Sequence, residues 1–285
     1  MKKTIVSLMA AFILVLSSFS AAYASSITME EIPERYTPNT TIEYQKDGSW
    51  KVIEKQVTIE ENESDEQELV SSRDRTIEDL IVKRIEEESE QYPHYQEVRT
   101  LPAPVVGMRV YYDPWGEIKT IKIQNHGQYV EVEPQYTIVN IGNPNEEIRA
   151  ITALPQGTRK PAGTYTYGTV EPNSVGYTTN TIKITTGSVL GTGDFTCFTD
   201  TIGDHNNYLQ YGDCATKGSY DNPWYGTVIY ARNMTTNVGT SFIKNDNGGL
   251  PYAVLDIWKT GLTKLGVTST NYGNIKFAGR YYYTF

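Results

Sequence analysis

The sequence predicts a mainly β protein whose C-terminal part folds as an all-β barrel or sandwich. Residues 163–285 are rich in Gly, Thr, Tyr and Asn and contain one short helical pattern, Trp258 to Leu265. Strand-like runs recur through this stretch, at residues 164–167, 181–186, 195–198, 227–231, 240–244 and 276–283. Short strands separated by Gly-rich corners are typical of β-barrels and β-sandwiches.

A small β-rich module is expected before the barrel. The runs at 105–112 and 117–123 flank Asp113-Pro-Trp-Gly116, which places Pro and Gly at the second and fourth positions of a turn. Two further runs, at 128–132 and 136–141, extend this pattern into an antiparallel meander. A separate hairpin is predicted within residues 41–59, with its turn at residues 46–49.

One helix is predicted upstream of that module. Thr76 followed three residues later by Asp79 is typical of a helix start, and the helix is expected to end near Ser89. Four apolar residues fall on one face at helical spacing and are expected to form its buried stripe: Ile77, Leu80, Ile81 and Ile85.

Charge divides the chain into unlike parts. Residues 25–100 hold 20 acidic against 9 basic side chains, whereas residues 101–285 hold 14 of each, within a total net charge of −9. Neither part has the basic patch that nucleic-acid binding needs. The organisation expected is a signal peptide (1–24), a partly disordered acidic leader with one helix (25–100), the β-rich module (101–154), a linker (155–163) and the barrel (164–285).

The first residues indicate export. Lys2 and Lys3 precede an apolar stretch from Ile5 to Phe19, and Ala22-Tyr23-Ala24 suits signal-peptidase cleavage. The stretch is shorter than the roughly 20 residues of a membrane-spanning helix. The mature chain is therefore expected outside the cytoplasm, secreted or associated with the cell wall, with no membrane attachment after cleavage.

The two cysteines of the chain are Cys197 and Cys214. In an oxidising compartment, such a pair predicts a disulfide. A metal site is not expected, because four-ligand spacing is absent and His205 is the sole nearby histidine.

Three segments of the C-terminal part carry a family resemblance. Gly193-Asp-Phe-Thr196-Cys-Phe198, Tyr225-Gly-Thr-Val-Ile229 and the long stretch 239–266, which contains Asp246 and Asp256, occur in the order and spacing found in expansins and rare-lipoprotein-A proteins. The resemblance covers residues 188–285. It implies a six-stranded double-psi β-barrel that acts on cell-wall glycan, with the two aspartates and Thr196 at the family's site positions.

The sequence also departs from these families. The lytic transglycosylases among them carry a His shortly before the Gly-Thr, where this chain has Ala215-Thr-Lys217. The Arg-Gly-Pro after their first Asp is replaced by Asn247-Gly-Gly249.

Asp256 is the better candidate for a working acid. Its neighbours Leu255, Ile257 and Trp258 are apolar, and desolvation would raise its pKa enough to keep it protonated for donation to a glycosidic oxygen. Asp246 lies among Asn and Gly in an expected turn and should stay hydrated and ionised. The plainer alternative makes Asp246 a turn former and Asp256 the N-cap of the following helix.

Aromatic residues on the predicted loops are candidates to stack on sugar rings. The substrate-binding candidates are Trp224, Tyr225, Tyr252 and Trp258. No cofactor is expected.

The sequence thus predicts a secreted, monomeric protein that binds peptidoglycan or a plant-type cell-wall polysaccharide. It would loosen that glycan or cleave it, as a lytic transglycosylase or another glycoside-cleaving enzyme does. The alternative is a non-catalytic protein-binding module, such as a cysteine-protease inhibitor of the same barrel fold, which needs no aspartate pair.

Overall fold

The structure, a computed structural model, describes residues 28–55, 72–149, 154–168 and 179–285 of the 285-residue chain. The predicted signal peptide and residues 56–71 of the predicted acidic leader lie outside these residues. None of the helices in the described ranges has the length and hydrophobicity that crossing a bilayer requires.

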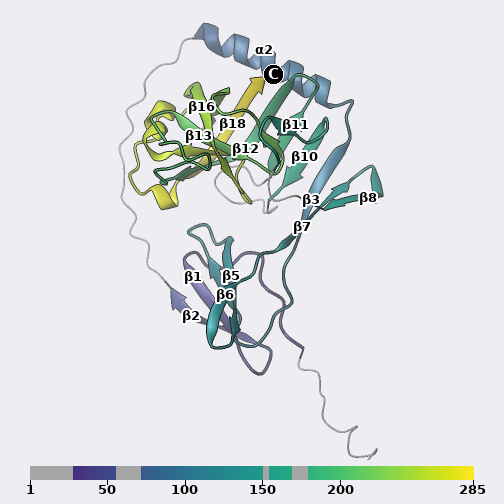
Figure 1. Cartoon of the computed structure of the whole chain (residues 1–285), viewed down its shortest axis with the longest axis vertical. Helices are drawn as coiled ribbons and strands as arrows, with labels where there is room; N and C mark the ends of the chain where they lie inside the picture. The colour runs from purple at the N-terminus through teal and green to yellow at the C-terminus, as the bar shows by residue number, and fades with distance from the viewer. Residues whose placement is uncertain (1–27, 56–71, 150–153, 169–178) are drawn as a thin grey trace, which may run out of the picture. The chain divides into compact units, whose positions relative to one another are not determined.

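The described chain forms two compact units (Figure 1). Residues 28–55 and 103–132 make up the sheet unit, and residues 72–102 and 133–285 make up the barrel unit. The predicted mainly β fold is confirmed: strands dominate both units.

The sheet unit is a five-stranded antiparallel sheet in the order β2-β1-β4-β5-β6. Its strands are β1 (Thr40–Tyr44), β2 (Trp50–Lys55), β4 (Arg109–Tyr112), β5 (Ile118–Asn125) and β6 (Gln128–Glu131). The predicted β1–β2 hairpin and the predicted turn before β5 are both present. Gly116 in that turn has a φ of +76°, and a Cβ there would lie 2.1 Å from the Tyr36 carbonyl oxygen, so only glycine fits.

The barrel unit contains a closed, six-stranded β-barrel, which confirms the predicted C-terminal barrel. Its strands pair in the order β12-β17-β13-β16-β15-β18, and β18 returns to β12. Two neighbouring pairs, β12/β17 and β13/β16, are parallel, and the other pairs are antiparallel. The bounds are β12 (Ser188–Phe198), β13 (Asp213–Lys217), β15 (Val228–Asn233), β16 (Gly239–Gly248), β17 (Leu255–Trp258) and β18 (Lys276–Thr284).

Five more strands extend the sheet outward from β12. They pair in the order β11-β10-β3-β7-β8, with β10 and β3 parallel. Their bounds are β3 (His94–Thr100), β7 (Gln135–Asn140), β8 (Asn143–Arg149), β10 (Gly163–Tyr167) and β11 (Asn180–Ile184). The expected meander therefore stops at β6, because β7 pairs with β3 instead. A two-stranded ladder joins β9 (Thr158–Arg159), inside the expected linker, to β14 (Asp221–Asn222).

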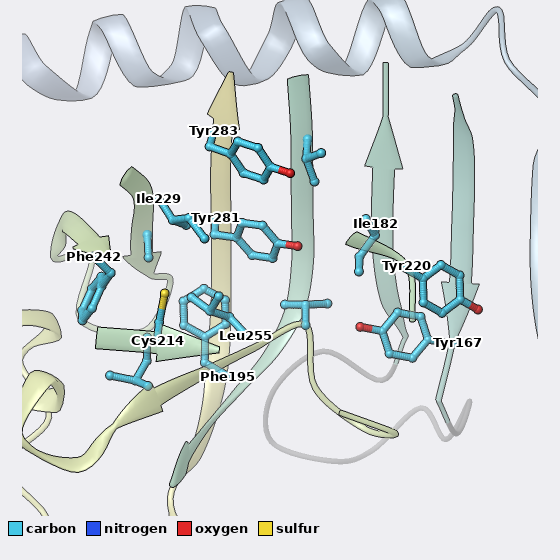
Figure 2. Packing of buried hydrophobic residues seen from close by; sticks show 14 of the residues in the cluster. Tyr167, Ile182, Phe195, Cys214, Tyr220, Ile229, Phe242, Leu255, Tyr281 and Tyr283 are labelled. Carbon is cyan, nitrogen blue, oxygen red and sulfur yellow. The ribbon is translucent and has the colours of Figure 1, made fainter. Parts of the chain in front are cut away.

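The core of the barrel unit is filled by side chains from many strands. Phe195, Leu255, Cys214 and Tyr281, which come from β12, β17, β13 and β18, belong to one cluster of buried side chains (Figure 2). All four side chains are 0% exposed, so each of these four strands contributes a residue that faces the barrel interior. Since strand residues alternate between faces, the residues between them point outward.

Helix α2 (Ser72–Ser89) lies across the strands of the barrel unit (Figure 1), and only part of the expected apolar stripe faces them. Ile77 and Leu80 are 54% and 63% exposed, whereas Glu78 is 2% exposed. The buried residues recur at helical spacing: Glu78, Val82, Ile85 and Ser89. The expected stripe is confirmed for Ile85 and Ile81, which pack on the barrel unit, and is wrong for Ile77 and Leu80. The face differs because Glu78 meets two arginines of the barrel, which rotates the helix away from Ile77.

The predicted disulfide is also wrong: Cys197 and Cys214 are both free. Ile257 on β17 pairs with Cys197 on one side and with Cys214 on the other, so a whole strand separates the cysteines. Strands are about 4.8 Å apart, which puts the two Cα atoms about 10 Å apart. That separation exceeds the roughly 7 Å that a disulfide can span.

The short helical pattern after β17 is a 3₁₀ helix, η1 (Lys259–Leu265), which ends at Gly266 with a φ of 70°. A second 3₁₀ turn, η2 (Tyr272–Asn274), precedes β18.

Candidate functional site

Four residues of the barrel lie in one row across neighbouring strands. Ala215 on β13 pairs with Asp246 on β16 and with Asp256 on β17. Asp256 in turn pairs with Thr196 on β12. Directly opposed residues of paired strands share a face, so the order Asp246–Ala215–Asp256–Thr196 forms one row, which we call the aspartate row.

The aspartate row lies on the outer face of the barrel. Leu255 and Ile257 are 0% exposed and belong to the core, so the alternation along β17 turns Asp256 and Trp258 the other way. Trp258 donates a hydrogen bond from Nε1 to the carbonyl oxygen of Asp200, 2.6 Å away. Trp258, predicted to bind substrate, therefore lies beside the predicted acid on the same face.

Asp256 is partly exposed and accepts a hydrogen bond from Thr196 Oγ1 at 2.9 Å. Desolvation raises the pKa of Asp256 to about 7, and the charges of Asp246 and Asp200 add to this, while the Thr196 hydrogen bond lowers it. The raised pKa agrees with the expectation from its apolar neighbours. The capping alternative is wrong, because Asp256 is a strand residue and Trp258 precedes the helix without a side-chain cap.

Asp246 differs from the expectation. It lies within β16 rather than in a turn, and it is only 8% exposed. Its Oδ1 accepts two backbone hydrogen bonds, from the N–H groups of Asp204 and Asn247, each at 2.9 Å. Burial raises the pKa of Asp246, and the two N–H groups oppose that shift. The expected hydrated carboxylate is absent because the segment after β12 folds back over the end of β16.

That segment, residues 199–212, brings a cluster of polar side chains next to Asp246. The Tyr225 hydroxyl donates to Asp204 Oδ1, and Asn247 Nδ2 donates to Asp204 Oδ2 at 2.7 Å. His205 stacks on Tyr225 with ring centroids 4.8 Å apart, and the Lys244 ammonium lies 4.0 Å from the centre of the Tyr225 ring. Tyr225, a predicted substrate contact, is thereby joined to the aspartate row through Asp204.

Two acids were missed from the sequence. Asp200 and Asp204 raise the pKa of Asp246, and Asp200 also raises that of Asp256. The sequence did show two aspartates four residues apart just after a predicted strand. No pattern in the neighbouring residues, however, indicated that this segment packs back on the barrel.

Two other predicted substrate contacts have different surroundings. Trp224 is 64% exposed, and its ring packs against Gly157, where an added Cβ would lie 2.4 Å from it. Tyr252 accepts a hydrogen bond from Arg99, whose guanidinium also lies 5.2 Å from the centre of its ring. Trp224 therefore packs on the segment that precedes β9, and Tyr252 on β3.

Within the part of the chain that the structure describes, no three His, Cys, Asp or Glu side chains are grouped to hold a metal ion. The chemistry open to the aspartate row is proton transfer by a carboxyl whose pKa is near neutrality, supported by a hydroxyl and a second carboxyl.

Comparisons with known proteins identify no relative: no protein-family model matches the sequence, and neither curated proteins nor solved structures gave a match.

Proposed function

We propose that the barrel is a double-psi β-barrel of the expansin and rare-lipoprotein-A type and that the exported protein binds cell-wall polysaccharide. Two features support this. The barrel has two parallel strand pairs, β12/β17 and β13/β16, placed side by side in an otherwise antiparallel barrel. The residues that resemble the family's site positions, Thr196, Asp246 and Asp256, also share one row.

The observation that carries the proposed reaction is Asp256. With a pKa of about 7, its carboxyl is partly protonated near neutral pH. It would donate that proton to the glycosidic oxygen as the bond from this oxygen to the anomeric carbon breaks. The Thr196 hydroxyl holds the carboxyl in place by its 2.9 Å hydrogen bond.

Asp246 would stabilise the positive charge that develops on the sugar. It lies two strands from Asp256, which corresponds to about 10 Å between Cα atoms. Once the face between them is open to substrate, two carboxyls on strands this far apart would admit a nucleophile between them, either water or a hydroxyl of the sugar itself.

The test compares wild type with Asp256→Asn on purified peptidoglycan and on cellulose. Released sugars and pelleted protein are measured, together with a melting curve of each sample. Loss of the proton donor should lower the rate of cleavage by about 10²–10⁴ with no matching loss of stability. Asp47→Asn, in an exposed turn of the sheet unit, serves as the control. Unchanged cleavage by Asp256→Asn would refute the catalytic role.

One observation favours the protein-binding alternative. Ile202 and Tyr208 form an isolated antiparallel bridge within residues 199–212, and they are 50% and 76% exposed. Exposed apolar and aromatic side chains on a loop are suited to contact with a partner protein, because aromatic residues are enriched in protein–protein interfaces. Inhibition of a papain-type cysteine protease by wild type, lost in Tyr208→Ala, would support this function over glycan binding.

A further inference from the structure

The aspartate row faces outward, yet its middle is closed to solvent. Ala215, between the two aspartates, is 2% exposed, and Asp246 is 8% exposed. Strand β13 is buried along its whole length, although only alternate residues of it face the barrel interior. Something must therefore cover the outer face of β13.

The segment 199–212, which we call the loop, is attached on every side of Ala215. Asp200 accepts the hydrogen bond from Trp258 on β17, and the Asp204 N–H binds Asp246 on β16. The Gln210 N–H donates to Asp213 Oδ2 at 2.6 Å, at the start of β13. A Cβ on Gly203 would lie 2.7 Å from the carbonyl oxygen of Asn245, so the loop backbone packs directly on β16.

The loop contributes little to the apolar core. Leu209 is its one buried apolar side chain, whereas Ile202, Tyr208 and Tyr211 are 50%, 76% and 63% exposed. Hydrogen bonds to polar groups, each of modest net strength, therefore hold most of it down. Segments with few buried apolar contacts open at lower free-energy cost than the core around them.

Asp204 is the most connected of the loop's polar residues. Its N–H binds Asp246, and its carboxylate accepts hydrogen bonds from both Tyr225 and Asn247. These partners come from β16 and from the segment before β15, so one side chain joins the loop to two parts of the barrel.

We propose that residues 199–212 form a lid over the Asp246 end of the aspartate row, latched by the Asp204 side chain, and that a glycan contacts Asp246 and Asp256 together only when this latch opens. The lid itself stands on the contacts above, whereas its role in glycan access rests on the proposed function.

The test places a thiol under the lid. Ala215→Cys is made together with Cys197→Ser, and the rate of reaction with a small aromatic disulfide is followed. Cys214, which is 0% exposed in the core, remains as an internal monitor: opening of the lid labels one thiol, whereas unfolding labels two.

Three variants are compared in this reporter background. Asp204→Ala removes both side-chain hydrogen bonds and should speed labelling by about tenfold to a hundredfold. Asp204→Asn should stay close to the reporter alone, because its amide can accept from Asn247 and donate to the Tyr225 hydroxyl. Thr201→Ala changes an exposed side chain of the same loop and is the matched control.

The proposal predicts slow labelling of one thiol in the reporter protein and fast labelling of one thiol with Asp204→Ala. Rapid labelling without Asp204→Ala would show that the row is not covered, and an equal, slow rate in every variant would show a rigid loop. Either result overturns the lid. Pelleting with peptidoglycan and cellulose is measured in parallel: faster labelling with no glycan bound by any variant leaves the lid standing and refutes the proposed function alone.

Discussion

Replacement of Glu78 by Gln tests how α2 is held on the barrel unit. Glu78 Oε2 binds Arg232 Nε at 2.7 Å, and Glu78 Oε1 binds Arg280 at 2.7 Å. Arg232 and Arg280 are directly opposite each other on β15 and β18, so two positive charges share one position of the outer face. Like charges placed this way are destabilising, and Glu78 is the group that neutralises them.

The size of the expected loss of stability in Glu78→Gln follows from the burial of the ion pair. Arg232 is 3% exposed and Glu78 is 2% exposed, whereas Arg280 is more open and also binds Asp79 at 3.2 Å. Removing one partner of a buried ion pair costs about 3–5 kcal/mol. Because Arg280 keeps Asp79, the expected loss is near the lower end, about 3 kcal/mol of unfolding free energy.

Urea unfolding of wild type and Glu78→Gln, followed by circular dichroism, measures this loss. The control is Glu87→Gln on the same helix: Glu87 is 66% exposed and meets Lys83 at 3.7 Å, so its loss should cost about 0.5 kcal/mol or less. A cost for Glu78→Gln equal to that of Glu87→Gln would refute the reasoning.

The same contact predicts acid sensitivity. Burial raises the pKa of Glu78, but the hydrogen bonds and charges of Arg232 and Arg280 outweigh it and leave the pKa below the ordinary 4.5. A lowered carboxyl pKa gives stability that is present above pH 4.5 and lost as the pH falls through the folded-state pKa. The difference between wild type and Glu78→Gln should therefore shrink in acid.

Three further predictions concern other parts of the chain. Thiol titration of the denatured, unreduced protein should find two free thiols, those of Cys197 and Cys214. A result of no free thiol would instead indicate a disulfide between them. Burial raises the pKa of Asp221 from 3.8 to about 7, and a carboxyl with a raised pKa gives stability that is lost as the pH rises. The unfolding free energy of wild type should therefore fall by about 4 kcal/mol between pH 4 and pH 8. Urea unfolding of Asp221→Asn should show no such fall, and parallel pH profiles of the two proteins would contradict the prediction. Gly116→Ala should destabilise the sheet unit by about 2–4 kcal/mol, through the positive φ and the clash with Tyr36, as seen by proteolysis of that unit; proteolysis at the wild-type rate would count against it.

Local sequence patterns predicted the structure correctly wherever residues close in sequence determine it. The turn at residues 113–116 and the hairpin of β1 and β2 were predicted from residue type and spacing, as was the 3₁₀ helix η1 before Gly266. The raised pKa of Asp256 was also anticipated, because Leu255 and Ile257 must point into any core that buries β17.

Predictions failed where a partner distant in sequence decides the outcome. The buried face of α2 is set by the ion pairs of Glu78 with Arg232 and Arg280, about 150 and 200 residues away, which leave Ile77 and Leu80 of the predicted stripe exposed. The two cysteines are close in sequence, but β17, formed some 40 residues later, lies between them.

The sequence by itself thus determined the mainly β class, since alternation and turn chemistry act over a few residues. The choice of a barrel over a sandwich came from the family resemblance, and Asp256 was singled out by that resemblance and by its apolar neighbours. Only the tertiary structure decided that Asp246 is buried and that Asp200 and Asp204 join it under the loop. Burial and electrostatic coupling depend on which strands become neighbours, and in a barrel with parallel pairs those neighbours are far apart along the chain.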